Sequence, residues 1–356
     1  MAPTSRFTAR KMLTALATAL ALSVASVSTT ALAADKKVTI SQAFQSMLYL
    51  PLYVAMDGGF FTKEGLDVAK QTAGSPSAAL SAVLSGSAEF SLHGPEWTAV
   101  AAEKGADVDV IVTVSSTGIA TPSLEARAFE RMGFRTDAAR IPVFGLGCAG
   151  GVTGLGLASK LAKATPGATV LLVVVEVCSL AVRTSDLDKA DIVAAALFGD
   201  GAAACVLRTG GGGIANIAGS AERLWPDTLN IMGWRVDPTG FGVIFDRAIP
   251  PFAKNNMRPA MEQMLAGQNL GMGDVDRFIC HPGGAKVIEA LEQSLSLGQG
   301  QLDFERQVLA DHGNMSAPTA LFVLDRARRA GLPPLSVVTA LGPGFSATTV
   351  TLKQAA

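Results

Sequence analysis

The stretch IPVFGLGCAGGVTGLGLASKLAKA, residues 141–164, carries the pattern that decides the fold. Its apolar start predicts a short strand over residues 141–145, and a glycine-rich turn follows over residues 147–151. Beyond the turn, apolar residues recur at helical spacing, which predicts a helix. A strand, a tight turn and a helix in this order are typical of an α/β protein.

Cys148 lies in this turn, at the start of the predicted helix. The backbone N–H groups and the dipole at a helix N-terminus favour negative charge, so we expect the pKa of the thiol to fall and its thiolate fraction to rise. The neighbouring side chains are small and leave room for an acyl group to reach the sulfur. The turn therefore predicts a nucleophilic cysteine.

Two other interpretations of the turn stay open on this stretch alone. Gly145, Gly147 and Gly150 spell G-x-G-x-x-G between the strand and the helix. Glu176 ends the next apolar run, LLVVVE, where a dinucleotide site places the acid that binds a ribose. In the third interpretation, the glycines only allow the strand and the helix to pack closely.

Composition limits the classes of protein that the chain can belong to. Its 356 residues are enough for two domains or one large layered domain, and 49% of them are hydrophobic, which favours a substantial core. Lys and Arg number 29 against 30 Asp and Glu, so no charge excess points to nucleic acid or to an anionic membrane. The four cysteines form no C-x-x-C pair, and we expect neither a metal site nor a disulfide framework.

The first residues match the pattern of a secretory signal peptide over residues 1–33. A positively charged start precedes an alanine-rich apolar run over residues 12–27, and a small-residue triplet ends at Ala33. The pattern predicts export to a bacterial periplasm, with no stable membrane span after cleavage.

Residues 34–111 alternate short predicted strands and helices, with one helix predicted over residues 50–57 after the start of the segment. The runs VTISQ, YLPLYVAMDGGFFTKEGLDV and SGSAEFS resemble the opening of periplasmic solute-binding proteins of ABC transporters, of the nitrate, sulfonate, taurine and thiamine-precursor type. The resemblance implies that the loops at residues 42–45, 74–77 and 93–96 contact a ligand. Because the second lobe of that fold is missing, it also implies a fragment of a lobe. The alternative function is a periplasmic solute-binding component of a transporter.

From residue 112 to residue 352 the chain resembles a different family. The motifs that carry this resemblance, in chain order, are SSTGIATPS, VFGLGCAGG, FGDGAAACVL, DPTGFGVIF, ICHPGGAKVIEAL, DHGNMSAPT and LGPGF. They resemble the type III polyketide synthases, which are chalcone and stilbene synthase-like enzymes of the thiolase fold. The resemblance implies an α/β, five-layer αβαβα arrangement whose first strands are missing or replaced, and a homodimer.

The two resemblances together predict a chimera. Residues 112–209 correspond to a truncated N-terminal region of the synthases and residues 210–356 to their C-terminal domain. The synthase chemistry implies the cytoplasm, where coenzyme A thioesters are made, whereas the leader predicts export.

The synthase resemblance favours the nucleophile at Cys148 over the dinucleotide site. It implies an acyltransferase that uses acyl- and malonyl-coenzyme A as substrates, needs no cofactor and performs decarboxylative Claisen condensation. His281 and Asn314 complete the implied catalytic set. The imidazole is expected to keep the sulfur as thiolate, and both side chains are expected to donate hydrogen bonds to the thioester oxygen of the enolate.

The resemblance also assigns residues to the substrate cavity. The loop at Ser116, Thr117 and Thr121 is expected to line the cavity and to reach the partner subunit. Val182 stands where plant relatives place a bulky phenylalanine, which predicts a wider mouth. The remaining cavity residues are Phe241, Val243, Gly344 and Phe345.

Overall fold

The structure is a computed structural model, and it describes residues 35–43, 45, 49–74, 87–88, 90–92, 108–183, 189–210, 212–238 and 240–355. The chain divides into two compact units, Met1–Gly94 and Pro95–Ala356. The predicted signal peptide lies outside the described residues. The predicted boundary between residues 111 and 112 falls inside strand β4 (Val110–Val114), which belongs wholly to the second unit.

The first unit contains a parallel three-stranded sheet in the order β2-β1-β3. The strands are β1 (Lys36–Gln42), β2 (Leu66–Thr72) and β3 (Phe90–Leu92), and helices α2 (Leu50–Asp57) and α3 (Phe60–Lys63) connect the first two. Parallel strands joined through helices are the unit from which an α/β lobe is built. The helix expected over residues 50–57 is confirmed.

Gln42, at the carboxyl end of β1, begins the first of the predicted ligand loops. Its side chain is buried and holds the unit together: Tyr53 Oη donates to Gln42 Oε1 at 2.8 Å, and Gln42 Nε2 donates to Thr72 Oγ1 at 2.8 Å. The other two predicted ligand loops lie outside the described residues except for Gly74.

The second unit contains two four-stranded mixed sheets, in the orders β5-β4-β6-β7 and β11-β12-β13-β8. In the first, β4 pairs in parallel with β5 and β6, and β7 runs antiparallel to β6. In the second, β11 and β12 are parallel and β13 is antiparallel to both of its neighbours. The strands not yet bounded are β5 (Ala139–Val143), β6 (Val170–Glu176), β7 (Gly201–Leu207), β8 (Ala215–Leu224), β11 (Arg277–Cys280), β12 (Leu335–Gly342) and β13 (Ser346–Gln354).

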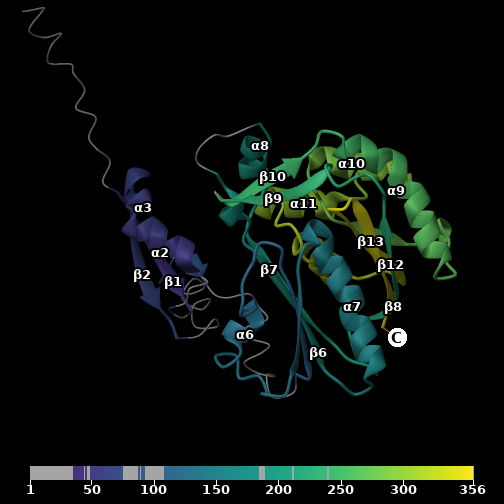
Figure 1. The fold of residues 1–356 in the computed structure, drawn as a ribbon, viewed down its shortest axis with the longest axis horizontal. Coiled ribbons are helices and arrows are strands. Elements are labelled where there is room, and N and C mark those ends of the chain that lie inside the picture. The colour runs from purple at the N-terminus through teal and green to yellow at the C-terminus, as the bar shows by residue number, and fades with distance from the viewer. Residues whose placement is uncertain are drawn as a thin grey trace, which may run out of the picture. The chain divides into compact units, whose positions relative to one another are not determined.

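Helices α7 (Gly150–Ala164) and α12 (Thr319–Ala330) form a layer between the two sheets, and Figure 1 shows α7 running between β6 and β8. The alternation of side chains along each strand builds this layering, because successive residues point to opposite faces. On β4, Val112 and Val114 join the core around α7, whereas Ile111 faces a second core cluster with Phe134.

The outer face of the other sheet packs on helices α9 (Ile249–Ala266) and α10 (Ala285–Leu295), and the short helix α6 (Leu124–Ala128) precedes β5. On β12, Val338 joins the central core and Val337 the outer one. Helices and sheets thus alternate in the αβαβα order, and that expectation is confirmed.

Three further elements of the second unit complete the fold. Strands β9 (Met232–Asp237) and β10 (Gly240–Phe245) form an antiparallel hairpin, helix α8 (Lys189–Leu197) contacts it, and helix α11 (Asp303–His312) precedes α12. Within the described ranges, each helix is too short or too polar to cross a bilayer.

Candidate active site

Cys148 lies where the first sheet meets the central helices. Strand β5 ends at Val143, two residues before the predicted end, and a single 3₁₀ turn, Gly147–Ala149, leads into α7. Gly147 has a φ of +48°, and a Cβ there would lie 2.7 Å from the Pro343 ring. Only glycine fits this backbone conformation and this close approach. The glycines of the turn therefore place the thiol against the second half of the chain.

Cys148, His281 and Asn314 come from three distant segments and line one buried cavity. The cavity has a volume of about 20 Å³, which is room for about one water molecule. Its other walls are mostly apolar: Met232, Phe245, Ile249, Gly283, Val287, Leu341 and Phe345. The structure thus brings the predicted catalytic set together in a buried, largely apolar environment.

His281 follows β11 directly and extends its pairing, because its backbone N–H donates to Thr339 O at 2.8 Å. Burial lowers the pKa of the imidazole to about 4. Within the described part of the chain, neither ring nitrogen has a hydrogen-bond partner. The ring is therefore neutral near pH 7 and free to exchange a proton with a reacting group in the cavity.

Asn314 has its amide oriented by two neighbours. Its Oδ1 accepts from the Ser316 backbone N–H at 2.8 Å, and its Nδ2 donates to Gly283 O at 3.2 Å. A primary amide carries two N–H donors, so one of them is left to donate into the cavity.

The pKa of Cys148 differs from the sequence expectation. Burial is the main cause that raises the pKa of the thiol to about 11, with a smaller contribution from the Glu176 carboxylate, and the hydrogen bonds with Ser316 and Asn314 oppose the rise. The predicted lowering is wrong because the turn is covered by the apolar walls of the cavity, and loss of water disfavours a thiolate more than the helix end favours it. Because the pKa of Cys148 is raised and that of His281 is lowered, the predicted thiolate–imidazolium pair is likewise disfavoured in the resting site.

Ser316 is a residue that the sequence reasoning missed. The Cys148 thiol donates to Ser316 Oγ, with Sγ and Oγ 3.6 Å apart. Ser316 stands in the HGNMSAPT motif and has a φ of +59°, a conformation that is rare for a residue other than glycine. The signal in the sequence was the position of this serine, two residues after Asn314 in the same motif.

Glu176 ends β6, as expected, but its carboxylate is not free for a ribose. Ser116 N–H and Thr117 N–H donate to its two oxygens at 3.0 and 2.9 Å, and Thr117 Oγ1 donates at 2.6 Å. Burial raises the pKa of this carboxyl. Ser116 Oγ in turn accepts from Gly147 N–H at 2.8 Å. This network holds the cysteine turn, which is a structural role and not the dinucleotide contact that was considered.

The predicted cavity residues are dispersed. Phe345 lines the cavity at Cys148, next to Gly344, whose φ of +129° requires glycine. Val182 is 51% exposed. Phe241 and Val243 lie on β10, where the Phe241 ring is 5.1 Å from that of Trp234. Ser116 and Thr117 are bound in the Glu176 network.

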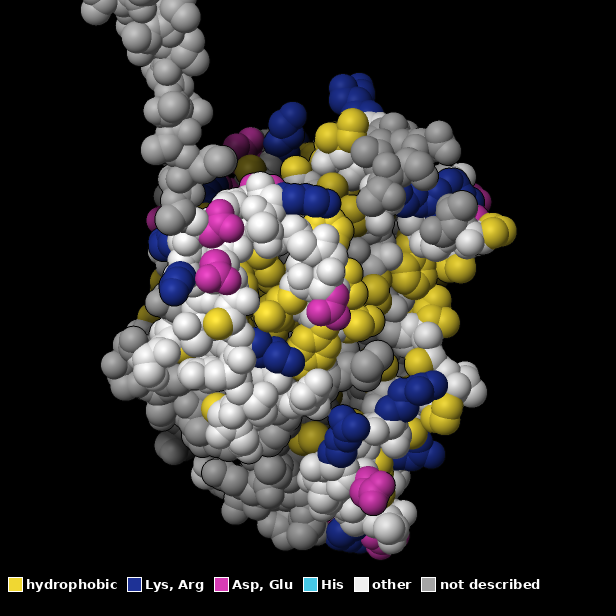
Figure 2. Space-filling model, turned by 90° about the vertical axis from the view of Figure 1, so that its left-hand side faces the viewer, with side chains coloured by type: hydrophobic (Ala, Val, Ile, Leu, Met, Phe, Trp, Pro, Cys, Tyr) yellow, Lys and Arg dark blue, Asp and Glu magenta, His cyan; other side chains and the backbone are white. Residues whose placement is uncertain are grey.

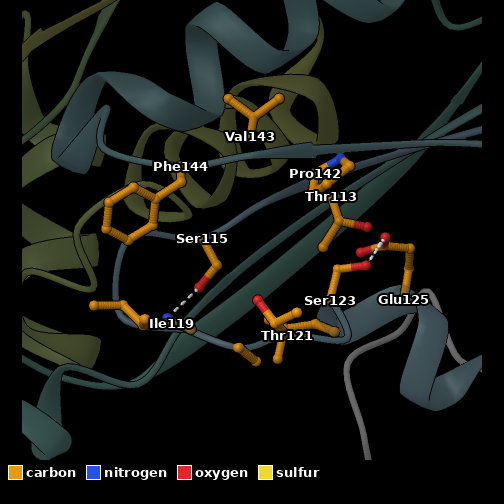
Figure 3. Close-up of a pocket in the computed structure, with 12 residues that line it drawn as sticks. Thr113, Ser115, Ile119, Thr121, Ser123, Glu125, Pro142, Val143 and Phe144 are labelled. Atoms are coloured by element: carbon orange, nitrogen blue, oxygen red, sulfur yellow. Dashed lines mark hydrogen bonds between the residues drawn. The ribbon is translucent and has the colours of Figure 1, made fainter.

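Thr121 borders a second, larger cavity of about 280 Å³ at the carboxyl ends of β4 and β5 (Figure 3). Ile119 and Phe144 lie at this cavity, and both side chains are more than half exposed to solvent. Ser123 Oγ donates to Glu125 at the other end of the same cavity.

Within the described ranges, His, Cys, Asp and Glu side chains nowhere gather in threes that would hold a metal ion. All four cysteines are free thiols. On the face shown in Figure 2, basic and acidic side chains are interspersed with exposed hydrophobic ones, as the near-zero net charge leads one to expect.

Comparison with known proteins agrees with this site. The family model of chalcone and stilbene synthases matches in two parts, the N-terminal domain over residues 88–211 and the C-terminal domain over residues 216–355. A third family model, NMT1/THI5 like, matches the shorter stretch 47–122.

Individual relatives show the same similarity. The chain is 43% identical over 256 residues to a 1,3,6,8-tetrahydroxynaphthalene synthase of Streptomyces peucetius, which covers 70% of this chain and 68% of the relative. The structure is similar to a tetrahydroxynaphthalene synthase of Streptomyces coelicolor, a bacterial type III polyketide synthase, with a TM-score of 0.67 at 30% identity over 70% of this chain and 72% of the other. It is equally similar to the C-terminal type III polyketide synthase domain of Steely1 from Dictyostelium, with a TM-score of 0.66, 30% identity and coverage of 71% and 72%.

Proposed function

We propose that this chain, which belongs to the chalcone and stilbene synthase family of type III polyketide synthases, extends an acyl starter with malonyl-coenzyme A through a thioester on Cys148. The observation that supports the proposal is the convergence of Cys148, His281 and Asn314 in one buried cavity. The substrates themselves supply the reactive groups, so coenzyme A thioesters are the small molecules that the reaction needs.

The first step loads the starter. Because both Cys148 and His281 are neutral at rest, the imidazole acts as a general base: it takes the thiol proton as the sulfur attacks the starter carbonyl. The carbon–sulfur bond to coenzyme A then breaks, and the departing thiolate recovers that proton. The products are an acyl group on Cys148 and free coenzyme A.

The second step makes the new carbon–carbon bond. Malonyl-coenzyme A loses carbon dioxide, and the electron pair left behind forms an enolate whose oxygen is negative. The free N–H of Asn314 and an N–H of His281 donate to that oxygen. The enolate carbon attacks the acyl carbonyl on Cys148, the bond from that carbonyl carbon to the sulfur breaks, and the departing thiolate takes up one proton from solvent water. The product is an extended thioester of coenzyme A.

The cavity must open for this cycle, because about 20 Å³ cannot hold an acyl chain. Met232 and Phe245, on the hairpin strands β9 and β10, are the partly buried walls of the cavity. Methionine has three rotatable bonds and adapts readily to a new shape. We therefore place substrate entry at this wall.

Mass spectrometry after incubation with malonyl-coenzyme A and a panel of acyl-coenzyme A starters tests the proposal. We expect an acyl adduct on the peptide that contains Cys148, release of free coenzyme A, and loss of both in the Cys148→Ala variant. If folded protein forms no adduct while a small alkylating agent still labels Cys148, the synthase activity is refuted although the nucleophile is intact.

We propose, in addition, that the chain works as a homodimer through the surface at the larger cavity. β5 is an edge strand of its sheet within the described residues, and Ile119 and Phe144 expose apolar side chains beside it. Unpaired strand edges and exposed apolar groups are features of protein interfaces.

We also propose that the chain joins two segments of different ancestry, a solute-binding-protein-like segment and the synthase region that follows it. The support is the short NMT1/THI5-like match over residues 47–122 beside the two synthase matches. The signal peptide over residues 1–33 stays a prediction, and the coenzyme A substrates favour the cytoplasm as the place of synthesis.

A further inference from the structure

We propose that Glu305 is a positioning residue for His281, acting through the backbone of Cys280. The inference rests on the proposed role of His281 as the base that activates Cys148. It concerns a carboxylate that lies outside the cavity and that none of the synthase motifs above assigns to the reaction. Glu305 lies on α11, the helix that leads through Gly313 to Asn314.

The position of Cys280 in the sheet leaves its backbone N–H in need of an acceptor from outside the sheet. β11 is the edge strand in the order β11-β12-β13-β8. In a parallel pair, successive backbone N–H groups point to alternate sides, and His281 N–H donates inward to Thr339 O on β12. The N–H of Cys280 therefore points away from the sheet, where no described strand accepts from it.

Glu305 supplies the missing acceptor. Its Oε1 accepts from Cys280 N–H at 2.8 Å, and both residues are completely buried. One carboxylate thus joins the strand that ends directly before His281 to the helix that ends shortly before Asn314. The same contact fixes the chain one residue before the imidazole, on the side that β12 does not hold.

The surroundings of Glu305 make its burial costly in free energy. The second oxygen of Glu305 has no hydrogen-bond partner among the described residues, and burial raises the pKa of the carboxyl to about 7. The charged groups that face it are Arg277, whose guanidinium lies 4.3 Å from the Phe304 ring, and Arg306, which pairs with Glu292 at 2.7 Å. Burying a carboxylate with one oxygen unsatisfied is costly, so its persistence favours a specific task over packing.

Two kinds of substitution distinguish the hydrogen bond that Glu305 accepts from the packing that its side chain provides. Glu305→Gln keeps an acceptor oxygen at the same reach, whereas Glu305→Leu removes it. Glu305→Asp keeps the charge but withdraws the acceptor by one methylene, and it replaces Glu305→Leu if that variant fails to fold. Val308→Ala, on the same helix and fully buried in the central core, is the matched control for loss of packing.

The measurement is the rate at which iodoacetamide alkylates the Cys148 peptide near neutral pH, read by mass spectrometry, with His281→Ala as the reference. We expect Glu305→Leu and Glu305→Asp to slow alkylation about tenfold or more, toward the rate of His281→Ala. Glu305→Gln and Val308→Ala should stay within about twofold of the unmodified protein. In a His281→Ala background, Glu305→Leu should have no further effect.

The outcomes distinguish the two proposals. If His281→Ala slows alkylation and neither Glu305→Leu nor Glu305→Asp does, or if Val308→Ala slows it equally, the positioning role is overturned and the proposed function stands. If His281→Ala leaves the rate unchanged, His281 is not the base for Cys148, and both that part of the proposed function and the role of Glu305 are overturned.

Discussion

At the scale of single residues, the site is neutral and buried. Cys148 has a raised pKa and His281 a lowered one, and burial is the main cause of both. Separating a proton from the sulfur in such a place creates two opposite charges side by side, which costs far less than creating one alone. Activation therefore coincides with attack on the substrate and does not precede it.

Asn314 offers a test of the enolate step. Asn314→Asp keeps the shape of the side chain but replaces the free N–H donor with a carboxylate oxygen, which repels the enolate. We expect decarboxylation of malonyl-coenzyme A to fall by about 10²-fold or more. Release of carbon dioxide from labelled malonyl-coenzyme A measures it. Asn314→Ser, which keeps a donor, should lose less, and equal losses in both variants would contradict the role of the amide.

Glu305 gives the protein a dependence of stability on pH. Its pKa of about 7 in the folded chain lies above the ordinary value of 4.5, so the folded state holds a proton that the unfolded state has released between these values. The free energy of unfolding therefore falls as pH rises from 4.5 to 7, by up to about 3 kcal/mol.

Glu305→Gln is neutral at every pH and lacks this contribution. Denaturant unfolding of both proteins at several pH values measures the difference, and subtraction removes the opposite contribution of His281. Parallel curves for the two proteins would show that Glu305 titrates normally.

The identities of the three cavity residues were predictable from sequence, but their ionisation was not. The motifs name Cys148, His281 and Asn314 because each is a short local pattern. The pKa values depend on Leu341 and Phe345, which reach the cavity from β12 and from the turn that follows it, far along the chain. Ser116 and Thr117 were expected at the cavity, but both donate hydrogen bonds to Glu176. A short loop motif does not reveal that a carboxylate on a distant strand binds the loop.

At the scale of elements, α7 is the helix on which the two sheets meet. A Cβ on Gly151 would lie 2.2 Å from Ala317 O, and one on Gly154 would lie 2.8 Å from the Val114 side chain. Such contacts are possible only without side chains, so the helix approaches both halves of the unit more closely than alanine would allow.

Gly151→Ala tests this close approach. We expect the free energy of unfolding to fall by about 1–3 kcal/mol, because the new methyl group meets a backbone oxygen that cannot rotate away. Denaturant unfolding followed by circular dichroism measures it. Gly273→Ala is the control, since a Cβ there meets nothing within 4 Å. An unchanged midpoint in Gly151→Ala would mean that α7 shifts freely between the sheets.

Periodicity predicted the regular elements well. The strand ending at Glu176 and the helix over residues 50–57 appear as expected. The strand before Cys148 begins and ends two residues earlier than expected, because its register is set by pairing with β4, from Val110↔Ala139 to Val114↔Val143. Local patterns contain no information about such a distant partner.

At the scale of the whole molecule, the proposed homodimer can be tested by the molecular mass of the protein in solution. Phe144→Glu places a charge on the proposed interface, and we expect it to shift the protein from dimer to monomer in light scattering coupled to gel filtration. Leu229→Glu, at a position that is 76% exposed and outside the proposed surface, should leave the dimer intact. A monomer without any substitution would refute the interface.

Layer order was predictable at this scale because the motifs identify a family with a known architecture. The junction at residues 111 and 112 was placed where the sequence motifs change. In the structure, strand β4 spans these two residues, and a change of motif does not reveal where a strand begins. Composition alone predicted only that the chain has a large hydrophobic core and that neither sign of charge dominates.

The position of β13 has a consequence for how the protein is made. This strand lies between β12 and β8, and its Val350 and Leu352 enter the same core as Val112 on β4. During translation, the face of α7 that β13 covers stays exposed until the last of these strands leaves the ribosome, an interval on the order of ten seconds or more. The nascent chain then carries a long apolar, glycine-lined helix without its cover, which makes it a natural client for chaperones.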